Sequence, residues 1–404
     1  MMLWLAIMPI LSIYRSPFIF SWSDASFFII AILALQHYGI KNLLTWPKKW
    51  KIYWCFVAVS YLVACMQYSS PFKAVIPGGF AFCLFSLQIG FTTNSVKIEL
   101  LYKYMKVISI VAIAIFFLQE VSAITTGVRF SALLPFGTLT DGLPISDLRV
   151  TQMYADRSCS IFREPAHFAQ YLLPMLAIEL FWKSKDKLIS PFSILLLVVI
   201  LFLRSGNGMI GILLLLLLKV ISYQKELSKT LRILFGVFAI VASLFCFAYI
   251  SKTIIGQELI KRTAEFENNE QSKSYIRIYR GFALFSSIPI EYKLIGTNNE
   301  GILSQIKQSQ VSYLFTGERD ESDLYFNGAA GILLHNGIIG LIFLVLYFID
   351  IGKKTDLLGR SLLLLFILIS FVAQTYMSSL MLMCCIIANQ QIPRNRGKYL
   401  EIKV

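Results

Sequence analysis

The sequence has few charged residues. Aspartate, glutamate, lysine and arginine make up only 15% of its 404 residues, whereas hydrophobic residues make up 57%. The mean hydropathy is accordingly high, at +0.68. Charged residues make up about a quarter of ordinary soluble domains, so this composition supplies too little polar surface for a soluble globule. We therefore expect an all-α polytopic integral membrane protein, with residues 1–404 forming a single transmembrane domain.

Several motifs of common chemistry are also absent. The sequence contains no nucleotide-binding loop, no HExxH, no G-x-S-x-G and no internal repeat. ATP-driven transport and common hydrolase chemistry are therefore unsupported. Of seven cysteines, only Cys159 lies outside the expected spans, and no CxxC spacing occurs. No outer disulfide is expected, and neither a metal site nor a cofactor is predicted.

Long apolar stretches are what the sequence does contain. The first begins at the N-terminus without a preceding basic region or a cleavage pattern, so it is expected to be retained as a span. Several stretches are shorter than the ~20 residues that cross a bilayer, so their boundaries are soft. The twelve expected spans are roughly 2–14, 26–40, 52–69, 75–93, 107–125, 165–182, 189–203, 208–222, 232–250, 329–349, 361–375 and 378–390.

Basic residues alternate between the connections of these spans. The short outer connections hold only Arg15, Lys73 and Arg204. The positive-inside rule then predicts that both termini are cytoplasmic. The formal charge of +14 follows from this topology, so nucleic acid is not an expected partner. Basic clusters fill the inner connections at residues 41–51, 97–106, 183–187, 225–232, 353–360 and 394–403.

Two larger loops are expected on the outer face, at 126–164 and 251–328. The first uses arginine and no lysine, and arginine offers a fork of donors that matches phosphate and carboxylate oxygens. The alternative is that the four arginines of this loop are ordinary surface residues without a ligand. The second loop contains SKSYIRIYRGFALF, in which Arg277 and Arg280 fall opposite an apolar face. This segment predicts an amphipathic helix, either at a lipid headgroup boundary or as a solvated support.

The segment SIFREPAHFAQYL joins the first outer loop to the sixth span. Glu164 and Pro165 are a sufficient start signal for a helix, because proline is tolerated at the first position and an acid is favoured there. Arg163 and His167 lie one helical turn apart beside them. Three ionisable groups at the mouth of a span are more than helix capping requires.

Two further positions stand out at span ends. Arg204 lies in a tight outer turn, where it either meets an anion or snorkels to the interface. Asn327 is expected at the mouth of the tenth span, with His335 about two turns inside it. His335 is either a base or a side chain satisfied by a neighbouring helix.

Together with the outer arginines, the segments SIFREPAHFAQYL, FLRSGNGMIGILLLL and FNGAAGILLHNGIIGLIFL resemble the O-antigen ligase and polymerase superfamily, most closely the Wzy-type polysaccharide polymerases. The resemblance implies the integral-membrane glycosyltransferase type C fold. It also implies a bacterial inner-membrane enzyme that is independent of metal and active at the periplasmic face. Such an enzyme moves a growing glycan from undecaprenyl pyrophosphate onto a lipid-linked repeat unit, and a chain-length regulator protein is an expected partner.

The resemblance also assigns residues. Glu164 with Pro165 matches the acid-proline pair of the family, Arg204 with Gly206 its arginine turn, and Arg277 its loop arginine. Gly337 and Gly340 match glycines of the late span. Phe326 occupies the position of the histidine that precedes this span in ligases, and His335 does not align with that histidine. This difference counts against a ligase.

The chemistry supports the same residues. Breaking a sugar-pyrophosphate bond leaves a growing negative charge that cations stabilise, and a sugar hydroxyl needs a base to become a good nucleophile. We predict Glu164, His335 and Arg277 as catalytic residues. Arg163, His167, Arg204, Arg280 and Asn327 are predicted to bind pyrophosphate or glycan. The alternatives are a ligase that acts on lipid A core, and a flippase or other transporter of lipid-linked oligosaccharides.

Overall fold

The described part of the chain is helical. The computed structural model describes residues 1–17, 21–38, 47–67, 72–93, 97–134, 138–139, 157–184, 187–224, 273–315 and 324–390. Within these ranges the chain forms helices and no β-strand, apart from two isolated bridges. Three described helices are long and apolar enough to cross a membrane: α6 (Ile98–Thr126), the segment Gly206–Tyr223 of α10 (Gly206–Gln224), and α16 (Gly328–Lys354). The protein is therefore a helical membrane protein, as its composition predicts.

The other apolar stretches also form helices. Each expected span coincides with a helix except 232–250, which lies outside the described residues. In the other helices, the described residues do not form an apolar stretch that counts as a full crossing, so the twelve spans stay a prediction. These other helices are α1 (Met2–Leu11), α2 (Trp22–Tyr38), α4 (Lys48–Gln67), α5 (Phe72–Thr93), α8 (Pro165–Ile178), α9 (Pro191–Phe202), α17 (Leu357–Ser370) and α18 (Ser379–Gln390).

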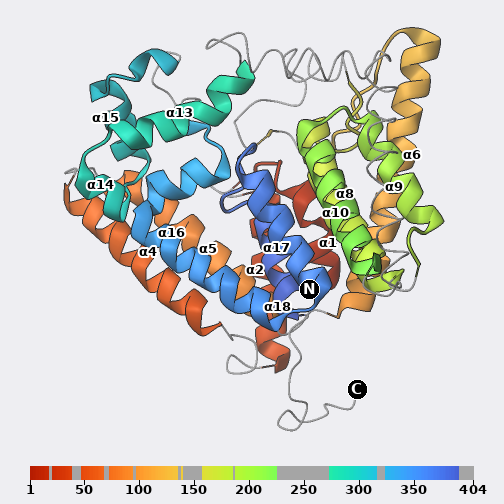
Figure 1. Cartoon of the computed structure of the whole chain (residues 1–404), viewed down its shortest axis with the longest axis horizontal. Coiled ribbons are helices and arrows are strands. Elements are labelled where there is room, and N and C mark those ends of the chain that lie inside the picture. Colours follow the sequence, from red (N-terminus) through yellow and green to blue (C-terminus); the bar gives the residue numbers. More distant parts are fainter. Residues whose placement is uncertain are drawn as a thin grey trace.

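The helices form two groups on either side of α17 (Figure 1). On one side, α16 packs against α4 and α14 (Ile290–Ile295). On the other, α8 packs against α9 and α10, and α6 lies beside them. Helix α17 contacts both groups, through α16 and through α10. Helices α8 and α18 are buried along most of their length, so they form the centre of the main apolar core.

A second, smaller core covers the start of α16. It is built from α13 (Lys273–Ser287), α15 (Asn299–Gln308) and the short 3₁₀ helix η2 (Ser312–Leu314), which pack around Phe326 and Ala330. These elements belong to the expected outer loop 251–328. Its described part is therefore a packed helical unit (Figure 1). The predicted amphipathic helix is present as α13.

The helices begin where their sequences predict. Pro165 occupies the first turn of α8 after extended Glu164, because the residue before a proline is driven out of the α region. The Asn327 side chain caps α16 by accepting from the Ala330 N–H at 2.9 Å. Helix α8 continues into a π-helical turn, η1 (Glu179–Lys183). The start of α8 and the start of α16 are the two places where expected site residues gather.

Candidate functional site

Arg163, Glu164 and His167 lie together at the start of α8. The Glu164 carbonyl accepts from the His167 N–H at 3.1 Å, which sets the two residues on one helical turn. Both the Glu164 carboxylate and the Arg163 guanidinium act electrostatically on the His167 imidazole. The Nδ1 atom of His167 is buried and makes no hydrogen bond to a described residue. The three ionisable side chains are therefore one cluster in space.

The Glu164 carboxylate is not used to cap α8. Glu164 is the N-cap residue, yet its side chain makes no hydrogen bond to the helix N-terminus. The carboxylate is half-buried. Its negative charge still interacts favourably with the positive end of the helix dipole. Helix capping therefore does not account for the Glu164 carboxylate.

The helix register brings Arg204 to the same end of the bundle. Helices α8 and α10 lie side by side, and a Cβ added at Gly208 would be 3.2 Å from Cβ of Ala169. A Cβ added at Gly211 would likewise touch Leu173, so the two helices run in the same direction. Arg204 lies in the turn just before α10, so it is at the same end of this helix pair as Pro165, the first residue of α8. We name Arg163, Glu164, His167 and Arg204 the charged cluster.

The backbone at Arg204 is strained. Its φ is 50°, in the left-handed region, and its side chain is exposed. A non-glycine residue held there costs on the order of 1–3 kcal/mol and persists only where its surroundings impose it. Here the close packing of Gly208 on Ile200 and Ala169 fixes the start of α10 directly after the turn. Strain of this kind is typical of functional sites.

Two residues that sequence reasoning missed hold the segment leading into α8. Ser160 has φ 58°, and its N–H donates to Oε1 of Gln119 on α6 at 2.8 Å. The Ser160 hydroxyl donates to the Ala112 carbonyl at 2.7 Å, also on α6. Gln119 and Ser160 are both fully buried. The position of Gln119 inside an apolar span could have indicated such a contact, because a buried amide needs hydrogen-bond partners.

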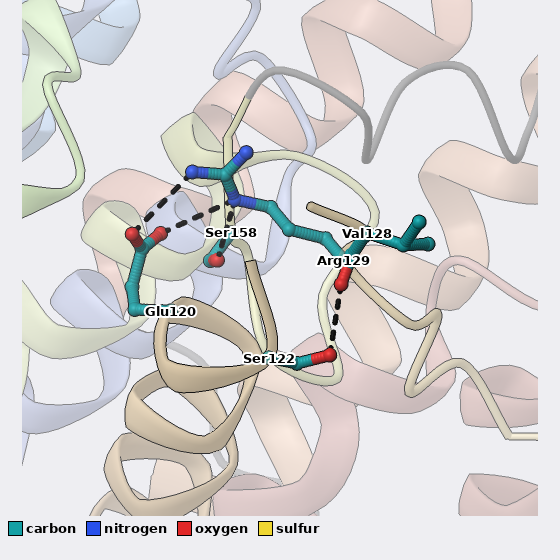
Figure 2. Close-up of polar contacts among 5 residues, drawn as sticks. All are labelled: Glu120, Ser122, Val128, Arg129 and Ser158. Atoms are coloured by element: carbon teal, nitrogen blue, oxygen red, sulfur yellow. Dashed lines mark hydrogen bonds and ion pairs between the residues drawn. The ribbon is translucent and has the colours of Figure 1, made fainter. Parts of the chain in front are cut away.

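An ion pair fixes the same segment from the other side. Arg129 bonds both carboxylate oxygens of Glu120 at 3.4 Å, and its Nε donates to the Ser158 hydroxyl at 3.2 Å (Figure 2). Ser122 donates to the Val128 carbonyl at 2.8 Å and closes the turn after α6. Glu120 is thus a structural acid. The end of α6 positions the loop that carries Arg163 and Glu164.

The arginines of α13 have different surroundings. Arg280 is buried, donates through Nε and Nη2 to the Tyr325 carbonyl, and lies over the rings of Phe315 and Phe326. Arg280 was expected opposite the apolar face, but it is buried and braces α13 against the residues before α16. The backbone of Arg277 lies in α13, but its side chain is outside the described residues.

Asn327 strengthens the same junction. Its side-chain oxygen caps α16, while its Nδ2 donates to the Ile278 carbonyl of α13 at 2.8 Å. The amide is almost completely buried. Asn327 and Arg280 together fasten α13 to the start of α16, and their predicted part in ligand binding is not needed to explain these contacts.

His335 lies beside a break in α16. Gly337 has non-helical backbone angles inside this helix, and His335 is two residues before it. The imidazole stacks on the Tyr376 ring, with centroids 6.1 Å apart and an interplanar angle of 22°. The neighbouring Asn336, which sequence reasoning missed, is fully buried and donates to the hydroxyls of Tyr53 and Tyr376 at 2.8 Å. A polar pair followed by glycine within an apolar run was the signal for this break.

The described ranges hold no group of three His, Cys, Asp or Glu side chains that could bind a metal ion. The acidic residues at 318–323 lie outside them. No protein-family model matches the chain, and no curated protein matches it.

Proposed function

We propose that the chain is a polysaccharide polymerase of the bacterial inner membrane. It transfers a growing glycan from undecaprenyl pyrophosphate onto a lipid-linked repeat unit at the periplasmic face. The observation that carries the proposal is the charged cluster, in which two arginines, an uncommitted carboxylate and a histidine gather at one end of apolar helices. The proposal includes twelve spans in a glycosyltransferase type C arrangement, with cytoplasmic termini.

The cluster suits both halves of this transfer. Glu164 accepts the proton of the acceptor hydroxyl as its oxygen bonds to the anomeric carbon. The bond from that carbon to the pyrophosphate oxygen breaks, and its electron pair leaves with the lipid pyrophosphate. Arg163 and Arg204 stabilise this growing charge, and arginine can bind a phosphate through two parallel hydrogen bonds. Arg277 of α13 is included as a third cation because it matches the loop arginine of the resemblance, and no metal ion is required.

A transporter of lipid-linked oligosaccharides is the second candidate. Helix α16 is discontinuous at Gly337, beside buried polar side chains. Discontinuous helices of this kind form the substrate sites of many secondary transporters. A ligase that acts on lipid A core is less favoured, because Phe326 occupies the position of the ligase histidine.

Deletion of the gene separates the three functions. A polymerase deletion leaves single repeat units attached to lipid A core and removes long polymer. A ligase deletion removes all attached glycan, whereas a transporter deletion prevents repeat units from reaching the outer face. Either of the last two phenotypes would overturn the proposal.

The expected orientation can be tested separately. In a variant without native cysteines, single cysteines introduced near 140 and 310 should react with an impermeant reagent from outside, and those near 185 and 400 should not. The opposite pattern would place the charged cluster on the wrong face for this reaction.

A further inference from the structure

Two glycines bring two chain segments into direct backbone contact at the break in α16. Gly296, after α14, has φ 79° and ψ −172°, and Gly337 has φ 63° and ψ −174°. This combination is essentially restricted to glycine. A Cβ added at Gly296 would overlap the His335 carbonyl, and one at Gly337 would overlap the Leu294 carbonyl. The turn between α14 and α15 therefore lies directly on the interrupted helix.

Hydrogen bonds fix this turn to its neighbours. The Thr297 N–H donates to the Leu334 carbonyl at 2.9 Å, and the Ser60 hydroxyl of α4 donates to the Ile295 carbonyl at 2.6 Å. Asn298 accepts from the Gly301 N–H at 2.8 Å and caps α15. The backbone of this region is thus well satisfied by hydrogen bonds.

Several polar side chains in the same place lack hydrogen-bond partners. Thr297 Oγ1, Asn298 Nδ2 and Asn336 Oδ1 are buried without a hydrogen bond to a described residue. All three residues are at most 4% exposed. Buried polar groups are nearly always paired, so each such atom needs an explanation. All three residues lie on the two touching segments, and a single partner that bonds all three atoms would satisfy them.

The side chains define the chemistry of that partner. We name Thr297, Asn298, His335 and Asn336, with Tyr53 and Tyr376, the neutral cluster. Its unpaired atoms include a donor, an acceptor and a hydroxyl that can do either. A phosphate is a poor fit, because it needs cations and would find only amides and hydroxyls here. A metal cation is also a poor fit, because it would meet the Asn298 amino group. A sugar hydroxyl both donates and accepts, and the Tyr376 and His335 rings offer an apolar face to a sugar ring.

We propose that the neutral cluster binds the hydroxyl-bearing edge of a sugar unit, as a second binding site separate from the charged cluster. Helix α17 lies between the two groups of helices that carry these clusters (Figure 1). The choice of a sugar among hydroxylated ligands rests on the proposed function. Entry of the ring requires the bonds from Thr297 and Ser60 to open, which frees the turn between α14 and α15.

Saturation-transfer NMR on the purified full-length protein tests the site. The probe is the oligosaccharide released by mild acid from the lipid-linked glycan of the same cells. Thr297→Val keeps the shape of the side chain and removes a hydroxyl that bonds no described residue. Thr355→Val is the matched control, because Thr355 at the other end of α16 also has a buried, unpaired hydroxyl. We expect saturation transfer to the sugar in the wild type and in Thr355→Val, and about tenfold weaker binding in Thr297→Val.

A second variant tests the site independently, in case Thr297→Val does not fold. Asn298→Asp retains the oxygen that caps α15 and removes the Nδ2 donor, so it too should weaken binding. Equal binding by Thr297→Val and Thr355→Val, or no transfer to the wild type, would overturn the inference and indicate that ordered water alone fills the cluster. Polymer formation in cells is measured independently. Sugar binding without any polymerase phenotype would therefore refute the proposed function and leave this site standing.

Discussion

The charged cluster at the start of α8 and the neutral cluster at the break in α16 differ in how they can hold a ligand. Arg163, Glu164 and Arg204 offer full charges at half-buried or exposed positions, where water screens them. Thr297 and Asn336 offer uncharged groups in a fully buried setting. Charge suits a pyrophosphate that must later be released, whereas buried neutral groups suit selection among sugars by hydrogen bonding. The comparison predicts that changes in the first cluster affect rate, and that changes in the second affect structure and binding.

The largest effect is expected from Glu164→Gln. The substitution keeps size and removes the base, and general base catalysis contributes about 10²- to 10⁴-fold. Polymer formation in a deletion strain that carries the variant should therefore nearly disappear at normal protein level. Asp350→Asn is the control and should leave polymer formation unchanged, because Asp350 only pairs with Lys354 at the far end of α16. If both variants make polymer at the wild-type rate, Glu164 is only a helix-start residue.

Gly337→Ala should give the next largest effect, on stability. The added Cβ would overlap the Leu294 carbonyl, and the backbone at φ 63° strains any side chain. We expect a loss of about 2–4 kcal/mol, seen as a lower melting temperature and less protein in the membrane.

Gly331→Ala provides the matched control in the same helix. A Cβ there would lie 3.9 Å from Cβ of Tyr376, which is an ordinary van der Waals contact. Equal stability of the two variants would mean that the break in α16 is not held by its glycine.

Arg277→Lys should lower the polymerisation rate at least ~10-fold, about 1.4 kcal/mol, because lysine keeps the charge but loses the paired geometry on a phosphate. Protein level should stay normal. Arg280→Lys, three residues along the same helix, should instead lower protein level, since Arg280 holds the Tyr325 carbonyl and two phenylalanine rings. Wild-type polymer from Arg277→Lys would contradict a phosphate-binding role.

The contrast between Arg277 and Arg280 shows which features can be predicted from the sequence alone. Periodicity predicted α13 correctly, because amphipathic spacing is a local property. The burial of Arg280 depends on Phe315 and Phe326, which follow far along the chain, and no local pattern reports such contacts. The trio of Arg163, Glu164 and His167 was found because its members are near in sequence and charged within an apolar chain.

The neutral cluster escaped prediction for the opposite reason. Tyr53, Asn336 and Tyr376 come from separate helical segments, and each is an ordinary residue in its own stretch. Their importance arises only when the helices assemble. Gly337 was matched to a family glycine, but the partner that makes it necessary, the turn at Gly296, became apparent only in the fold.

Arg204→Gly should give the smallest change in stability and is the reverse of Gly337→Ala. It removes a Cβ from a left-handed position, which relieves about 1–2 kcal/mol of strain. Glycine also gains freedom in the unfolded chain, which offsets about 0.4–1 kcal/mol of this. The relieved strain and the lost contacts of the Arg204 side chain act in opposite directions, so the melting temperature should change little. Polymer formation should nevertheless fall, because the variant loses a cation of the charged cluster. A melting temperature that falls together with polymer formation would mean that Arg204 stabilises the turn through its contacts, and the charged cluster would then consist of Arg163, Glu164 and His167.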